Sequence, residues 1–256
     1  DACNEGAPET LQGRIVPARA AGELNMTGLK FRVRRWSGIA IALFVLQFIA
    51  LPVTASETAA FTEAMRRYFP KGTINTVLSS GENDSSVKRA YICVEQPEIT
   101  GVRYERILLD LKDLRRHFVN DAVRIDGIAS AAISGTLTKA EFERAIAVGF
   151  PSLKNIKITF SKKSIDILGV YEKSYLVRVR ALMGFHGRYE IDSRTGTASL
   201  VFSDVTNDNA MVSAGEIVTV LEKACPKLDF NSLPGRPAVR HVVVDENRIW
   251  FSTVAR

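Results

Sequence analysis

The chain has 256 residues, of which 46% are hydrophobic and 24% are charged, and its formal net charge is +6 at pH 7. These proportions are ordinary for a globular protein, so they exclude a disordered, a collagen-like or a polytopic membrane protein. The basic residues are scattered rather than gathered into a stripe, and we therefore predict no nucleic-acid partner. A mildly positive balance still favours contact with an anionic membrane surface.

An export leader is predicted over residues 30–55. Residues 30–35 read KFRVRR and residues 36–55 carry no charge, which is the pattern of a signal peptide, and Val53-Thr54-Ala55 fits its cleavage site. The apolar run is also as long as the ~20 residues that span a bilayer, so an anchor over 36–55 stays open. We predict an exported protein of the periplasm or cell envelope. Residues 1–29 are expected to be an upstream or disordered segment.

The predicted exported part, residues 56–256, opens with a helical pattern over 57–69, where Phe61, Met65 and Phe69 recur on one face. Strand patterns follow. They are bounded by Gly, Asn and Ser clusters typical of turns and lie over 73–78, 87–94, 102–111 and 123–137.

Two capping boxes then predict helices, Thr138 to Glu141 and Ser213 to Glu216. Residues 153–206 alternate in polarity like a meander of strands, and the last two strands, 238–244 and 247–254, are predicted to form a hairpin. Because strands come in runs rather than alternating with helices, we predict a single α+β domain with a mainly antiparallel sheet over 56–256.

Catalytic and metal-binding motifs are not found. His117, His186 and His241 lie far apart and none has the spacing of a zinc site. A serine-hydrolase nucleophile turn and a phosphate-binding loop are also missing. We therefore expect no metal, no cofactor and no enzymatic activity. An envelope hydrolase acting on lipid or glycan stays open, since its acidic residues can come from distant segments.

The sequence has three cysteines, Cys3, Cys93 and Cys225. If Cys3 is removed with the leader, Cys93 and Cys225 remain and an oxidising compartment would let them form a disulfide. The alternative is two separate buried thiols, because free cysteine behaves as a small core residue.

Bulky residues on both faces of a strand, such as Val242 to Val244, require cover on both faces or an apolar cavity. Further segments carry a family resemblance, namely VKRAYICVEQPEITGV (87–102), ILLDL (107–111), GTLTKAEFERAI (135–146) and the Leu-Pro segment with the closing strands (228–252). From about Phe61 to Val254 the chain resembles the bacterial LmeA-like phospholipid-binding family, which is similar to the tubular lipid-binding proteins. The resemblance implies a curved, mainly antiparallel sheet wrapped around amphipathic helices.

The function that the resemblance implies is non-enzymatic binding of phospholipid or another acyl lipid in an apolar groove. The apolar helix faces would take the acyl chain, with Phe142, Ile146, Ile217, Val220 and Leu221 as the expected contacts. Lipid headgroups would meet the basic residues Lys154, Lys157, Lys162 and Lys163. These lysines are equally explained as charges that keep a hairpin edge from aggregating. A structural module of a membrane complex is the remaining alternative.

Overall fold

The computed structural model of the chain describes residues 55–254 except 82–85, 120–121 and 175–177. The chain divides into two units, Asp1–Pro52 and Val53–Arg256, and every described residue belongs to the second. The predicted segment 1–29 and the predicted leader 30–55 lie outside the described residues, apart from Ala55. The export prediction therefore stays a prediction.

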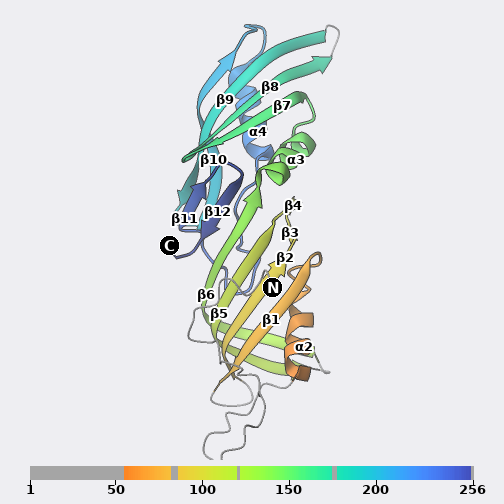
Figure 1. Cartoon of the computed structure of the whole chain (residues 1–256), viewed down its shortest axis with the longest axis vertical. Helices are drawn as coiled ribbons and strands as arrows, with labels where there is room; N and C mark the ends of the chain where they lie inside the picture. The colour runs from red at the N-terminus through yellow and green to blue at the C-terminus, as the bar shows by residue number, and fades with distance from the viewer. Residues whose placement is uncertain (1–54, 82–85, 120–121, 175–177, 255–256) are drawn as a thin grey trace, which may run out of the picture. The chain divides into compact units, whose positions relative to one another are not determined.

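A six-stranded sheet forms one half of this unit (Figure 1), and every neighbouring pair in it is antiparallel. Its strands in spatial order are β1 (Thr73–Ser80), β2 (Ser86–Glu95), β5 (Arg106–Val119), β6 (Ala122–Thr138), β12 (Arg248–Ser252) and β11 (His241–Val244). A two-stranded ribbon, β3 (Glu98–Ile99) with β4 (Val102–Arg103), lies between β2 and β5 in the chain.

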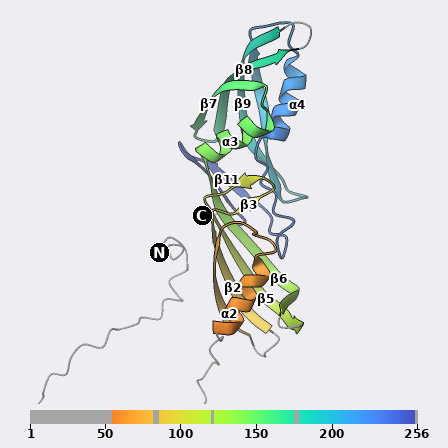
Figure 2. The same cartoon turned by 90° about the vertical axis from the view of Figure 1, so that its right-hand side faces the viewer.

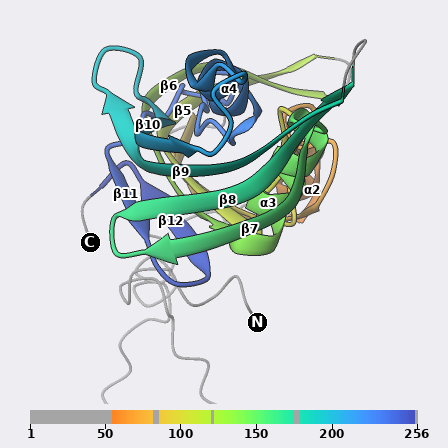
Figure 3. The ribbon, with the colours of Figure 1, turned by 90° about the horizontal axis from the view of Figure 1, so that it is seen from above.

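A four-stranded antiparallel meander forms the other half (Figure 3). Its strands in spatial order are β10 (Thr197–Asn207), β9 (Arg178–Asp192), β8 (Ser164–Ser174) and β7 (Leu153–Ser161). The structure thus confirms the α+β class and the mainly antiparallel pairing.

Three helices of 11 residues each pack on the sheets, α2 (Ala55–Met65), α3 (Lys139–Gly149) and α4 (Ala214–Ala224). α2 contacts β1 and β6, whereas α3 contacts β7, α4 contacts β10, and α3 and α4 contact each other (Figure 2). Within the part of the chain that the structure describes, no helix is long and apolar enough to cross a membrane.

The two predicted capping boxes differ in the structure. At α3 the Thr138 hydroxyl accepts a hydrogen bond from the Glu141 N–H at 3.3 Å, as the motif requires. At α4 Ser213 has extended backbone geometry but its side chain makes no capping hydrogen bond. The sequence therefore predicted the starts of both helices correctly. Of the two capping residues, only Thr138 accepts a hydrogen bond from an N–H of the first turn that has no partner within the helix.

Several predicted boundaries are wrong, among them the start of β11, which lies at His241 rather than at residue 238. The first helix ends at Met65 rather than at residue 69. The single strand predicted over 102–111 is divided into β4 and β5, because the Tyr104 N–H donates to the Pro97 carbonyl and the Glu105 N–H donates to the Thr136 carbonyl. These two hydrogen bonds turn the chain from the small ribbon into the large sheet.

The core is one continuous cluster of buried side chains drawn from both sheets and all three helices. On the inner face of the large sheet, Ile92 of β2 lies opposite Leu109 of β5 and Val94 lies opposite Ile107. A three-ring cluster of Tyr104, Phe230 and Phe251 adds aromatic contacts with centroids 4.9–5.7 Å apart. The three rings come from the segment after β4, from the segment after α4 and from strand β12. The cluster therefore brings distant parts of the chain into contact.

Candidate functional site

The residues predicted to hold an acyl chain lie on α3 and α4. Phe142 and Ile146 of α3 are fully buried, as is Leu221 of α4, and Ile217 is 5% exposed. These four belong to the same core cluster, so the fold brings them together in the interior. Val220 does not join them, because its side chain is 45% exposed on the outer side of α4.

The four predicted headgroup lysines are all exposed but do not share one site. Lys154 and Lys157 lie on β7, and Lys162 and Lys163 form the turn between β7 and β8. Lys157 lines a hollow on the exposed face of the four-stranded sheet, whereas Lys162 lines a cleft at the end of that sheet.

The predicted disulfide between Cys93 and Cys225 is wrong. Cys225 is a free, buried thiol, so it does not pair with Cys93. Cys93 lies on β2 of the six-stranded sheet, whereas Cys225 caps the C-terminal end of α4, where its N–H donates to the Leu221 carbonyl. Burial raises the pKa of the Cys225 thiol well above its usual range, so it stays protonated.

A cleft of about 680 Å³, here the inter-sheet cleft, separates the end of the β7–β8 hairpin from the β11–β12 hairpin. Both β7 and β11 are edge strands of their sheets. The described residues that line the cleft are Phe160, Ser161, Lys162, Val243, Val244, Asp245, Glu246 and Trp250.

The walls of the inter-sheet cleft are apolar and its rim is charged. Val243 is 58% exposed and pairs across the strands with Trp250. Lys162 and the adjacent Asp245 and Glu246 place charges of both signs at the rim. An apolar pocket with a few polar groups at its edge is the usual form of a small-molecule site.

Phe160 links the inter-sheet cleft to the interior. It is 5% exposed, and its ring packs edge-on against Phe142 of α3 at a centroid distance of 5.5 Å and an interplanar angle of 81°. The cleft therefore ends on a ring that contacts one of the residues predicted to hold an acyl chain.

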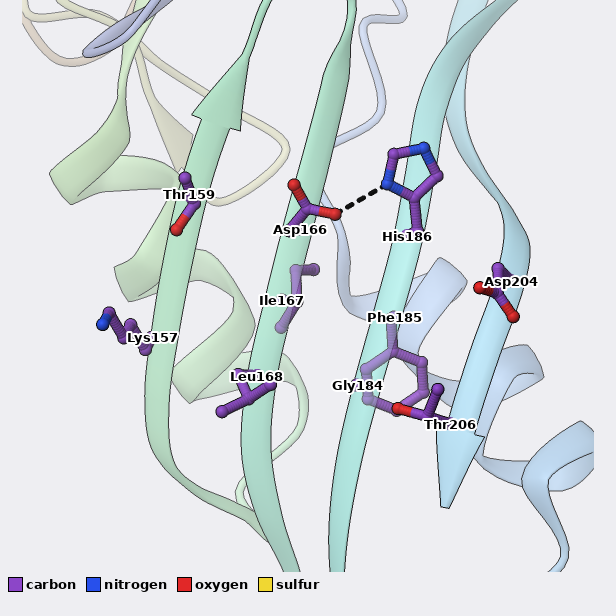
Figure 4. A pocket seen from close by; sticks show the side chains of 10 residues that line it. All are labelled: Lys157, Thr159, Asp166, Ile167, Leu168, Gly184, Phe185, His186, Asp204 and Thr206. Atoms are coloured by element: carbon purple, nitrogen blue, oxygen red, sulfur yellow. Dashed lines mark hydrogen bonds and ion pairs between the residues drawn. The ribbon is translucent and has the colours of Figure 1, made fainter.

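A second hollow of about 340 Å³, here the His186 pocket, lies on the exposed face of the four-stranded sheet (Figure 4). The described residues that line it are Lys157, Thr159, Asp166, Ile167, Leu168, Gly184, Phe185, His186, Asp204 and Thr206. They come from all four strands of the sheet.

His186 stands between two carboxylates in this pocket. Its Nδ1 lies 2.6 Å from an oxygen of Asp166, and both side chains are about half exposed. Asp166 on β8 and Asp204 on β10 are the residues directly opposite His186 on the neighbouring strands. The register of β8, β9 and β10 thus places Asp166, His186 and Asp204 in one row across the sheet. No local sequence motif contains these three residues.

Metal binding is not supported by this arrangement. The structure offers no group of three or more His, Cys, Asp or Glu residues suited to a metal ion in the residues that it describes. What the row provides is a histidine with one ring nitrogen held by a carboxylate, next to a second carboxylate. Such a group can bind a cation or exchange a proton.

The His186 pocket was missed at the level of sequence. Asp166, His186 and Asp204 are distant in the chain, and a shift of one residue in register would move any of them to the buried face. The alternating polarity of residues 165–168 identifies the exposed face but not the neighbours of Asp166.

Comparison of the chain with protein-family models, with curated proteins and with solved structures finds no match.

Proposed function

We propose that this chain is an exported cell-envelope protein that binds phospholipid or another acyl lipid and catalyses no reaction. The observation that carries the proposal is the inter-sheet cleft, whose apolar walls end on the contact between Phe160 and Phe142. Its volume of about 680 Å³ lies within the usual range of ligand pockets. Each CH₂ group moved from water into such a site contributes about 0.8 kcal/mol.

The acyl chain would enter between Val243 and Phe160 and extend along the apolar faces of α3 and α4. An acyl chain that moves from water into the protein needs an interior with few polar groups. Among the described residues, Arg116, Thr136 and Thr197 are the buried polar or charged side chains, and the rest of the buried set is hydrophobic, although Tyr104 adds a buried hydroxyl. The sheets are proposed to curve around the helices as in the tubular lipid-binding proteins, so that movement of the helices opens the groove.

The headgroup would stay at the rim of the inter-sheet cleft. Lys162 lines the cleft and Lys163 is next to it in the turn, and both are exposed. A basic residue near an anionic membrane surface contributes about 1 kcal/mol of attraction. The phosphate would therefore stay in water at the β7–β8 side of the rim, beside Lys162 and across the cleft from Asp245 and Glu246, while the acyl chain is buried.

The test uses the full chain, purified without added lipid and examined by mass spectrometry for copurified acyl lipid. Binding of a fluorescent fatty acid is then compared between the wild type and Val243→Asp. A charge in the apolar wall should weaken binding at least tenfold, which corresponds to about 1.4 kcal/mol. Val77→Asp is the matched control, because Val77 is similarly exposed (64%) but lies on β1 and not among the residues of the cleft.

Two results would reject the proposal. One is the repeated lack of acyl lipid in pure protein. The other is equal fatty-acid binding by Val243→Asp and Val77→Asp.

A hydrolase is the second candidate, favoured by the hydrogen bond between Asp166 and His186. A carboxylate that holds Nδ1 leaves Nε2 to take a proton from water, as a general base does. The described residues that line the pocket include neither Ser nor Cys, and in this candidate mechanism the nucleophile is the water that His186 activates rather than the hydroxyl of Thr159 or Thr206. Hydrolysis of a chromogenic ester by the wild type and its loss in His186→Gln would support this reading, and equal rates would reject it.

A further inference from the structure

We propose that the His186 pocket binds a zwitterion in which a phosphate is joined to an amine, as in phosphoethanolamine. This inference goes beyond the proposed function, which concerns an acyl chain in the inter-sheet cleft. The same chemistry exists in a free metabolite and in the headgroup of a phospholipid, and the experiment below separates the two sources.

Two charges of opposite sign lie at the two sides of this pocket without an ion-pair partner. Among the residues that the structure describes, neither Lys157 nor Asp204 takes part in an ion pair, although both line the pocket. They lie on β7 and β10, separated by β8 and β9. Neighbouring strands are about 4.8 Å apart, so the two side chains are too distant to neutralise each other.

The residues between these charges do not neutralise them either. Asp166 and His186 are hydrogen-bonded to each other at 2.6 Å, across β8 and β9. The pocket therefore has an unpaired cation on the β7 side, an unpaired anion on the β10 side and a paired group between them. A ligand that carries both an anion and a cation complements this order of charges.

Hydroxyl groups accompany each of the two charges. Thr159 lies two residues from Lys157 on the same exposed face of β7, and Thr206 lies two residues from Asp204 on β10. Lys157 and Thr159 are donors suited to a phosphate, whereas Asp204 accepts hydrogen bonds from an ammonium group. Figure 4 shows Lys157 turned toward the outer edge of β7, and its flexible stem allows the amine to swing over the pocket.

Gly184 keeps the floor of the pocket open. A Cβ atom at this position would lie 2.5 Å from Oγ1 of Thr206 and 3.6 Å from a methyl group of Leu168. Glycine inside a strand weakens it and often marks the close approach of a ligand. The exposed Leu168 beside it offers apolar contact to the CH₂ groups that join the phosphate to the amine.

The test measures binding of phosphoethanolamine, inorganic phosphate and ethanolamine to the full chain by calorimetry. Phosphoethanolamine should bind more tightly than either half. Asp204→Asn and Lys157→Gln should each weaken it roughly tenfold, because each removes one charge-assisted contact. Gly184→Ala, which fills the floor, should abolish binding while circular dichroism shows an unchanged fold.

Two variants on the same part of the sheet serve as matched controls. Arg194→Gln and Glu190→Gln remove one charge each at exposed positions outside the His186 pocket, and both should bind phosphoethanolamine like the wild type. Val243→Asp should also bind it normally, so a failure of the acyl-lipid proposal leaves this one intact. The inference is overturned if inorganic phosphate binds as tightly as phosphoethanolamine, or if the pocket variants equal their controls.

Vesicles identify the source of the zwitterion. Wild-type protein is sedimented with vesicles of phosphatidylcholine alone and with vesicles that also contain phosphatidylethanolamine. Preferential binding to the second kind that is lost in Asp204→Asn identifies a lipid headgroup. Binding of soluble phosphoethanolamine without this preference identifies a free metabolite, and both results support the site.

Discussion

At the scale of single residues, three buried groups near the end of α4 hold protons that an unfolded chain would lose. Burial raises the pKa of Cys225 and of Tyr189, and it raises the pKa of Tyr104 as well. The Tyr189 hydroxyl donates to the Pro226 carbonyl at 2.7 Å, which favours its neutral form further. The folded chain therefore keeps all three groups neutral.

These groups predict a loss of stability at alkaline pH. In the unfolded chain a cysteine loses its proton at about pH 8.5 and a tyrosine at about pH 10. Above these values the unfolded state binds fewer protons than the folded state, so the free energy of unfolding falls as pH rises. Urea denaturation between pH 7 and 11 should show a decline that begins near pH 8.5 and becomes steeper above about pH 10.

Cys225→Ala separates the thiol from the two tyrosines. This variant should show no decline between pH 8.5 and pH 10 and should keep the steeper decline above it. A wild type whose unfolding free energy is constant up to pH 10 would contradict the assignment.

At the scale of elements, the two predicted helix starts form a matched pair. Thr138 caps α3 through its hydroxyl, whereas Ser213 makes no side-chain cap at α4. Thr138→Ala should lower the free energy of unfolding by about 1 kcal/mol. Ser213→Ala should change it by no more than a few tenths of a kcal/mol, and a loss as large as that of Thr138→Ala in chemical denaturation would contradict this account.

Element boundaries were predictable where single residues determine them. Thr138 begins α3, and Pro151 follows the last helical residue Gly149 by two positions, because a capping hydroxyl and a proline act within one or two residues. The break between β4 and β5 was not predictable. It depends on hydrogen bonds from Tyr104 and Glu105 to Pro97 and Thr136.

The candidate site was less predictable than the elements that build it. Asp204 lies opposite His186 because the register between β9 and β10 shifts between Phe202 and Asp204. Such an irregularity turns a side chain to the other face, and the sequence carries no mark of it. The inter-sheet cleft likewise requires β7 and β11 to be edge strands, which depends on the order of strands in both sheets.

At the scale of the whole molecule, the two sheets share one core. Buried residues from α2 to β12 form a single cluster, and the three-ring cluster of Tyr104, Phe230 and Phe251 joins three separate parts of the chain. We expect Val53–Arg256 to unfold in one cooperative transition, since neither sheet has a separate core.

Phe230→Ala tests this expectation. Removal of the ring should lower the free energy of unfolding by about 3–5 kcal/mol. Circular dichroism and tryptophan fluorescence should still report one coincident transition at a lower midpoint. Two transitions, in the wild type or in the variant, would show that the sheets are independent.

The neighbours of β6 determine the order in which the large sheet is completed. Arg248 of β12 pairs with Thr138 of β6, and α3, the four-stranded sheet and α4 all lie between them in the chain. During synthesis β6 therefore waits with one side unpaired until all four strands of the other sheet, and then β12, have been made. Such distant pairing slows folding and exposes intermediates to aggregation. A nascent chain that stops before Arg248 would carry β6 as an open edge, ready to pair with another chain.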